Sequence, residues 1–215
     1  MPRNVDTIEV GNPLRDAVGA VEGAPFPSLD GDINLLIFGG SQGTSIFSAA
    51  PVTALAGLPA EIRARLVVTH QARDSDKDEV ARKYEAADIR ADVAPFFGDL
   101  PQRMAKAHLV IARAWASTVT ELSAIGRPSI LVPLAIAMDD HQTGNARTLS
   151  EQGAAVILPE TEFTEERIGA TLSELLSSPA KLATMASAAQ GVVKSGAAAR
   201  LADLVEDIVA IKAAA

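Results

Sequence analysis

The sequence predicts an α/β fold, a doubly wound parallel sheet of about six strands, and three observations support this prediction. Hydrophobic residues make up 48% of the 215 residues and aromatic residues only 4%, which suits helices packed on a buried sheet. Short apolar runs are continuous rather than alternating, as is typical of strands covered on both faces. Stretches of helical length separate these runs, as the connections between parallel strands require.

Residues 1–30 stand outside this pattern. They contain four prolines and show little periodicity, so we expect an irregular lead or interdomain linker there. Residues 31–215 are expected to form one domain. Its predicted strands are Ile33–Phe38, Leu66–Thr69, Ala91–Pro95, Leu109–Ala112, Ser129–Val132 and Ala154–Leu158. Its predicted helices are Ser75–Ala87, Thr118–Ile125, His141–Gln152, Thr164–Leu176, Pro179–Ala189 and Ala197–Lys212.

Composition excludes several classes of protein. The net charge is −8 and no run of Lys or Arg stands out, so we expect no nucleic-acid partner. Cysteine is absent, which excludes disulfides, thiolate catalysis and Cys-ligated zinc. No stretch approaches the roughly 20 apolar residues of a transmembrane helix, and the N-terminus does not read as a signal peptide. The expected location is cytoplasmic.

Parallel sheets bind ligands at the carboxyl ends of their strands, so the segment after the first strand is a candidate site. Residues 39–43 read GGSQG. Glycines let a backbone approach a ligand, and the N-terminus of the next helix would offer unpaired N–H groups to an anion. A tight turn with no ligand explains the same residues, and the two interpretations stay open.

The segment 113–121 reads RAWASTVTE and also follows a strand. Thr118 and Glu121 have the spacing of a capping box, with Thr118 as N-cap. A carboxylate at this edge of a sheet is also suited to bind ribose hydroxyls. From the residues alone, we favour the capping interpretation.

A third polar group lies at the start of another predicted helix, where residues 139–145 read DDHQTGN. Acidic residues near a helix N-terminus are more often caps than ligands, and no partner at ligand spacing accompanies them. We therefore expect no metal. His70 and His108, at a strand end and a strand start, are interpreted as structural or solvent-facing.

Taken together, these segments resemble the MurG family. The motifs are GGSQG, TVTELSAIGRPSILVP, DDHQTGNA and GAAVILP in that order, and residues 10–15, VGNPLR, resemble the family's interdomain linker. That family transfers N-acetylglucosamine from its UDP donor to a lipid-linked peptidoglycan precursor at the inner face of the membrane. The resemblance implies that residues 31–215 are the Rossmann-like donor-binding half of a GT-B glycosyltransferase.

The resemblance also implies roles for individual residues. Glu121 would bind the ribose hydroxyls, which reverses the preference for a cap. Ser41 would lie near the donor diphosphate, Arg15 would reach the donor from the linker, and the backbone of Phe97 would pair with uracil. The complete set of expected UDP-sugar contacts is Arg15, Gly40, Ser41, Phe97, Ala116, Ser117, Thr118, Glu121, His141 and Gln142.

The chain departs from the family pattern where it replaces small or polar residues with apolar ones. Ala114 and Trp115 stand where the family has Ser-Gly, and Ile136 stands where it has His. With Phe47 just past the glycine loop, these residues would gather at one edge of the sheet. Because apolar patches and Trp anchors mark interaction surfaces, the alternative function is a cleft altered, by divergence or design, into a protein-interaction or self-association surface.

The acceptor-binding half of a GT-B enzyme has no counterpart in this sequence. We therefore expect an N-terminal acceptor domain or a partner chain to complete the enzyme, and no transfer activity from this chain alone. We also expect a donor affinity below that of the family, because Trp115 would fill space that a glycine leaves to phosphate.

Overall fold

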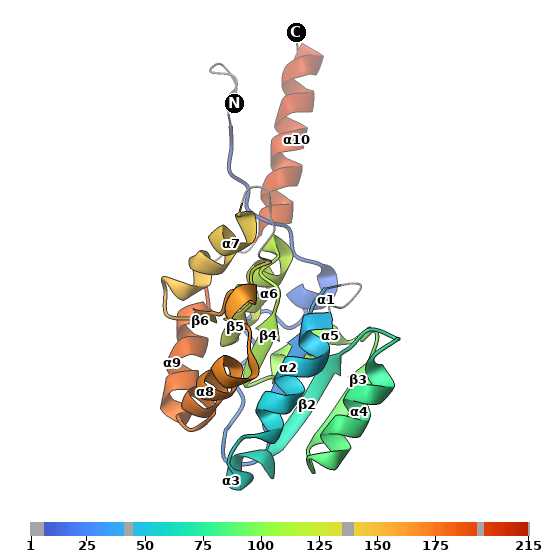
Figure 1. The fold of residues 1–215 in the computed structure, drawn as a ribbon. Helices are drawn as coiled ribbons and strands as arrows, with labels where there is room; N and C mark the ends of the chain where they lie inside the picture. Colours follow the sequence, from blue (N-terminus) through green and yellow to red (C-terminus); the bar gives the residue numbers. More distant parts are fainter. Residues whose placement is uncertain (1–6, 41–44, 135–139, 193–195, 215) are drawn as a thin grey trace.

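The computed structural model describes residues 7–40, 45–134, 140–192 and 196–214. Its centre is one parallel sheet with the strand order β3-β2-β1-β4-β5-β6 (Figure 1). The strands are β1 (Ile33–Phe38), β2 (Leu66–Gln71), β3 (Arg90–Ala94), β4 (Leu109–Ala112), β5 (Ser129–Leu131) and β6 (Ala155–Ile157). The predicted Rossmann-like fold class is confirmed. The strand order reverses between β1 and β4, so a ligand crevice is expected at their carboxyl ends.

Ten helices and one 3-10 turn occur in the described part of the chain. The helices are α1 (Asp16–Gly19), α2 (Ser45–Ala56), α3 (Ala60–Arg63), α4 (Lys77–Ala86), α5 (Leu100–Lys106), α6 (Ala116–Ile125), α7 (His141–Ser150), α8 (Glu165–Leu176), α9 (Pro179–Ala189) and α10 (Ala197–Ala214). The 3-10 turn is Glu160–Glu162.

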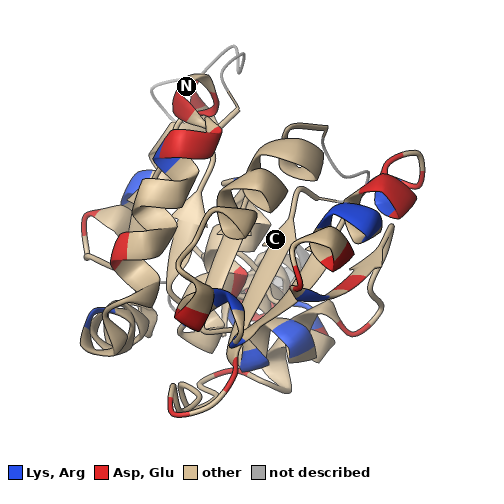
Figure 2. Ribbon diagram, turned by 60° about the horizontal axis from the view of Figure 1, so that its bottom comes forward, with Lys and Arg blue, Asp and Glu red and all other residues tan. Residues whose placement is uncertain are grey.

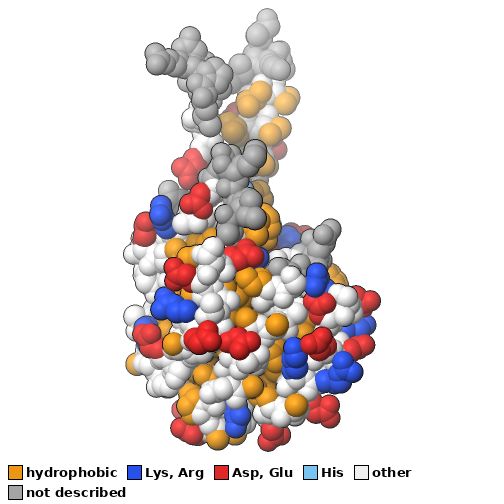
Figure 3. All heavy atoms as spheres, in the orientation of Figure 1, with side chains coloured by type: hydrophobic (Ala, Val, Ile, Leu, Met, Phe, Trp, Pro, Cys, Tyr) orange, Lys and Arg blue, Asp and Glu red, His pale blue; other side chains and the backbone are white. Residues whose placement is uncertain are grey.

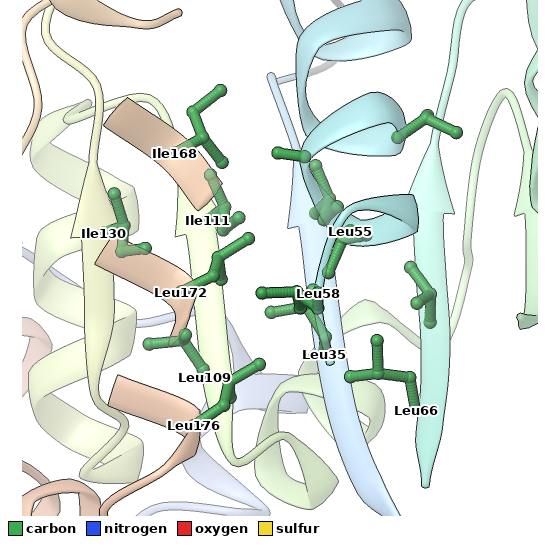
Figure 4. Close-up of a cluster of buried hydrophobic side chains, with 14 of the residues drawn as sticks. Leu35, Leu55, Leu58, Leu66, Leu109, Ile111, Ile130, Ile168, Leu172 and Leu176 are labelled. Carbon is green, nitrogen blue, oxygen red and sulfur yellow. The ribbon is translucent and has the colours of Figure 1, made fainter. Parts of the chain in front are cut away.

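The sheet divides the core into two layers. Leu35 and Ile37 of β1 pack in one apolar cluster with residues of α2, α4 and α8. Figure 4 shows part of this cluster between α8 and α2. Leu36 and Phe38 point to the opposite face and pack with residues of α1, α5, α6 and α7. Because successive side chains of a strand alternate between faces, burial on both faces explains the continuous apolar runs of the sequence.

Charged side chains lie mainly on helices and loops around the sheet (Figure 2). The two central strands, β1 and β4, contain none. Ligand-binding charges near the switch point must therefore come from segments outside these two strands.

The lead segment packs against the domain where it is described. Val18 of α1 is fully buried, and the backbone N–H of Gly23 donates to the carbonyl of Ala124 at 2.8 Å. The buried guanidinium of Arg127 donates to lead carbonyls and to carbonyls at the C-terminal ends of α5 and α6, where helix dipoles favour a cation. These acceptors are Ala24, Pro25, Met104, Ala105, Ile125 and Gly126.

The long helix α10 projects from the body of the domain, and the first described residues of the lead, from residue 7, run beside it (Figure 1). Arg200, near the start of α10, donates to the carbonyl of Val10 at 2.9 Å. Beyond this contact, α10 exposes large apolar side chains. They are Leu201, Val205, Ile208 and Val209, which are 42–61% exposed. Their spacing places them on one face of the helix.

Candidate functional site

A cavity of about 460 Å³ lies at the carboxyl ends of β1 and β4, where the strand order reverses. Its walls come from the lead segment, from the loops after β1, β3 and β4, and from the first turns of α6. Among the residues predicted from the sequence, it brings together Arg15, Gly40, Phe97, Ser117, Thr118 and Glu121. Trp115 also lines it.

Helix α6 begins with Ala116, and Trp115 precedes it in an extended conformation, with φ −67° and ψ 148°. The predicted capping box is therefore wrong: Thr118 lies inside the first turn, and no side chain caps this N-terminus. The chain enters α6 at Ala116, soon after β4 ends at Ala112, and two residues before the predicted start of this helix at Thr118. The first turn of α6, with Ser117 and Thr118, lines the cavity. A helix N-terminus in this position favours an anion.

The carboxylate of Glu121 is the acidic group at the wall of the cavity. Its side chain is only 9% exposed, and burial raises its pKa. Arg15 opposes this shift, because its Nε lies 3.0 Å and its Nη2 2.8 Å from Oε1 of Glu121. Arg15 itself is 61% exposed. The pair therefore places an accessible guanidinium and a nearly buried carboxylate side by side at the cavity.

A second contact joins the lead to α6. Nδ2 of Asn12 donates to Oγ1 of Thr120 at 3.1 Å, and that hydroxyl donates to the carbonyl of Ala116 at 2.8 Å. Asn12 and Thr120 both line the cavity. Sequence reasoning missed these two residues, although Asn12 belongs to the VGNPLR segment and Thr120 precedes Glu121.

Trp115 lies beside Gly40, at the described start of the glycine loop. Gly40 has a φ of +104°, and a Cβ atom added there would lie 3.2 Å from Nε1 of Trp115. The indole ring therefore lies close to the Gly40 backbone, in space that glycine leaves open. Trp115 is 41% exposed. Ser41, which we expect near the diphosphate, lies outside the described residues.

The cavity includes an exposed aromatic residue that the sequence reasoning missed. Phe96 is 71% exposed and lines the cavity beside Phe97. The Phe97 side chain is buried, and the guanidinium carbon of Arg103 lies 4.2 Å from its ring centroid. With its side chain held in this way, Phe97 leaves mainly its backbone to contact a ligand.

Comparison with known proteins decides the family. The family model for the glycosyltransferase family 28 C-terminal domain matches residues 34–206. This chain belongs to that family. The family 28 domain described here is 48% identical over 206 residues to a UDP-N-acetylglucosamine–N-acetylmuramyl-(pentapeptide) pyrophosphoryl-undecaprenol N-acetylglucosamine transferase from Methylorubrum extorquens. The relative with the same name from Agrobacterium fabrum is 47% identical over 204 residues.

The alignments cover 94% of this chain but only 56% and 54% of these two relatives. Among solved structures, the domain is similar to Acinetobacter baumannii MurG, with a TM-score of 0.77 and 32% identity. That match covers 85% of this chain and 54% of the other. The MurG resemblance seen in the sequence motifs is confirmed, and the chain spans little more than half the length of these proteins.

The structure does not place every expected contact at the cavity. Ala116 is exposed at the start of α6 and is not part of the lining. His141 is exposed and Gln142 is buried at the start of α7, and neither lines the cavity. Oε1 of Gln142 accepts from the backbone N–H of Leu134 at 3.1 Å. In this family 28 domain, Gln142 thus fastens the end of the β5 segment to α7.

The predicted apolar patch needs correction. Phe47 is fully buried and packs edge to face on Phe163 at 5.3 Å between ring centroids, because α2 turns it toward the core. Ala114 is also fully buried. Neither residue can contribute to an exposed surface. Ile136 lies outside the described residues, which leaves Trp115 as the exposed member of the predicted set.

Among the described residues, no group of three His, Asp or Glu side chains is placed to hold a metal ion. His70 and His108 have structural contacts, as the sequence interpretation allows. Nδ1 of His70 lies 2.9 Å from the hydroxyl of Tyr84, and His108 accepts from the backbone N–H of Asn34 at 2.8 Å. Within the same described ranges, no helix is long and apolar enough to span a bilayer.

Proposed function

We propose that this chain is the donor-binding half of a glycosyltransferase that uses UDP-N-acetylglucosamine to make a lipid-linked peptidoglycan precursor. The observation that carries the proposal is the cavity at the switch point, with the Glu121 carboxylate beside the N-terminus of α6. A carboxylate that can accept hydrogen bonds from hydroxyls and a helix N-terminus that favours an anion thus lie within one site. The names of the relatives indicate the donor sugar and the acceptor class.

Each part of the donor has a matching group in this arrangement. The ribose hydroxyls would donate to Glu121, as they do to acidic residues in other nucleotide-binding folds. The diphosphate would accept from the first turn of α6 and from the glycine loop at Gly40, with Ser41 beside it. Arg15 would supply positive charge to the diphosphate. The backbone of Phe97 would bind uracil. No metal is part of this proposal.

The expected contacts to the donor sugar come from the start of α7. His141 and Gln142 lie at the start of α7, outside the cavity lining, and Gln142 already accepts from Leu134. For these two residues to reach the sugar, the donor would have to extend from the cavity toward α7. We keep His141 as a proposed contact because its side chain is exposed.

The acceptor-binding half is proposed to come from beyond this domain and to cover the apolar face of α10. The relatives are nearly twice as long, and the matching family model describes a C-terminal domain. Figure 3 shows hydrophobic side chains along the described part of α10, above the body of the domain. Asp203, Glu206 and Asp207 occupy the other side of the helix by its periodicity. This acidic side disfavours a membrane of anionic lipids as the occupant.

Calorimetric titration with UDP and with 2′-deoxy-UDP tests the donor proposal. If Glu121 accepts from the ribose hydroxyls, UDP binds more tightly, by roughly the 1–3 kcal/mol typical of hydrogen bonds to a charged group. Both ligands share the base and the diphosphate, so this comparison isolates the ribose contact. Equal affinities would remove Glu121 from the role proposed for it.

A further inference from the structure

Two side-chain contacts join the same two segments of the chain in parallel. Asn12 of the lead donates to Thr120 of α6, and three residues later Arg15 binds Glu121, the next residue of α6. Both contacts lie at the cavity wall. The first is between neutral groups, whereas the second is an ion pair whose members belong to the proposed donor site.

The Asn12 contact has a defined direction. The single proton of the Thr120 hydroxyl is directed at the carbonyl of Ala116, 2.8 Å away, so its oxygen is left to accept. Asn12 must therefore present its NH₂ group, at 3.1 Å. An aspartate of the same shape would present only acceptors and could not replace it.

The Arg15 guanidinium needs such an anchor. Its side chain is 61% exposed, so burial does little to hold it in place. The short helix α1 fixes the chain after Arg15 through the buried Val18, and the half-buried Leu14 packs against the same apolar cluster, but Pro13 before them is exposed. Pro13 restricts its own φ and disfavours helical backbone at Asn12, so this short segment is stiff. Fixing Asn12 therefore restrains the approach of the chain to Arg15.

We propose that Asn12 is a positioning residue: by donating to Thr120 it holds the lead on α6 so that the Arg15 guanidinium stays at Glu121 and at the donor cavity. The effect on donor binding rests on the function proposed above. The effect on the Arg15–Glu121 pair does not, because that pair is present without a ligand.

The first test needs no ligand. Carbon-13 NMR titration of the Glu121 carboxyl should show a higher pKa in Asn12→Ala than in the unmodified chain. Arg15 is the charged group that lowers this pKa, so the variant should approach the value of Arg15→Ala. Thr120→Val, which removes the acceptor and keeps the shape, should behave like Asn12→Ala.

Thr171→Val is the matched control. The Thr171 hydroxyl donates to the carbonyl of Arg167 at 2.8 Å, the same backbone contact that Thr120 makes, but on α8. It should leave the Glu121 pKa unchanged. A variant that merely loosened the fold would lower the Tm without a specific change at Glu121.

The second test is a double-mutant cycle on UDP affinity. Asn12→Ala should weaken UDP binding about three- to tenfold, the effect of losing one neutral hydrogen bond. In an Arg15→Ala background the same change should have little further effect, because its target is already gone. An equal loss in both backgrounds would show that Asn12 acts independently of Arg15, and would overturn the proposal.

The two tests fail separately. If the Glu121 pKa does not move in Asn12→Ala, the positioning role is wrong whatever UDP does. If the pKa moves as expected and UDP does not bind the unmodified chain, the positioning role stands and the donor-binding function is wrong.

Discussion

At the scale of single residues, the ionised side chain of Glu121 is disfavoured by burial, and it is the proposed contact for the ribose hydroxyls. Burial raises its pKa, and Arg15 only partly offsets this effect. The ionised form of the carboxylate is the one that can accept hydrogen bonds from two hydroxyl groups. A residue whose charge the fold opposes, placed in a cavity, is a functional candidate on physical grounds.

The first prediction concerns Glu121→Gln. A raised pKa means that the native state binds the proton more tightly than the unfolded state, so this group's contribution to stability falls as pH rises through the native pKa. Glutamine does not titrate. The stability of the variant relative to the unmodified chain should therefore increase with pH, while UDP affinity at neutral pH decreases. Urea unfolding at several pH values measures the first effect. A stability of the variant relative to the unmodified chain that decreases as pH rises would contradict it.

Trp115 carries the second prediction. Its indole lies against Gly40, where the backbone would have to approach phosphate oxygens. Trp115→Gly should raise UDP affinity at least about tenfold, and glycine is also acceptable as the residue before a helix. Trp115→Phe, which keeps a ring, should recover less.

Trp115 is the only tryptophan of the chain, so its fluorescence reports on this site directly. Tight UDP binding by the unmodified chain with no change in emission would show that the ring does not obstruct the ligand.

At the scale of residues, the structure brings several predicted donor contacts to one cavity, and their roles in binding stay predictions. Arg15, Gly40 and Glu121 line this cavity, and they could be predicted because each lies in a recognisable sequence segment. Asn12 and Thr120 were missed, since their side chains meet only when the lead folds back onto α6. Phe96, in the loop after β3, was also missed. Phe47 was misplaced because a residue that follows a loop can still face the core once a helix begins there.

At the scale of elements, the strands were predicted best. The predicted bounds of β1 and β4 agree with the structure, because both strands are apolar runs with clear ends. A helix was expected after the glycine loop, but the sequence did not predict the bounds of α2, Ser45–Ala56. This helix contains Pro51, and apolar residues occur all round it, so the sequence lacks the one-sided pattern of a surface helix. The start of α6 was predicted two residues late, because a capping pattern was given more weight than the end of β4.

The third prediction concerns the contact between β2 and α4. Burial lowers the pKa of His70 to about 4, from 6.5, because the protonated form would lose hydration beside Tyr84. This group therefore contributes its full stability above pH 6.5 and loses it as pH falls toward 4. The loss is at most about 3 kcal/mol, at 1.36 kcal/mol for each pH unit.

Urea unfolding of His70→Gln checks this prediction, since the variant should lose less stability than the unmodified chain between pH 6.5 and 4. His141→Gln is the matched control, because its side chain is exposed. Parallel stability curves for His70→Gln and the unmodified chain would show that His70 is protonated without cost.

At the scale of the whole molecule, the described part of the chain holds the cavity at the switch point and an exposed apolar face on α10. These two features agree with the alignments, which extend over little more than half of the relatives. The division of labour in the proposed enzyme follows: this domain orients the donor, and the other half brings the acceptor. Orientation of both reactants supplies much of the catalysis in such a reaction.

The fourth prediction is that the chain alone transfers no N-acetylglucosamine to a lipid-linked acceptor. Adding the separately produced N-terminal half of the Methylorubrum extorquens relative should restore measurable transfer. Leu201→Glu with Ile208→Glu should abolish this restoration and leave the Tm nearly unchanged, because both side chains are exposed. Asp203→Asn, on the other side of α10, is the control. Transfer by the chain alone would contradict the prediction.

The most direct test of the central claim is the position of UDP in a crystal structure of the chain bound to it. We expect UDP in the cavity at the carboxyl ends of β1 and β4. Its ribose hydroxyls should lie within hydrogen-bond distance of the Glu121 carboxylate, its diphosphate at the start of α6, and the Trp115 ring away from Gly40. UDP bound elsewhere on the chain, or bound in the cavity with its ribose away from Glu121, would contradict the central claim.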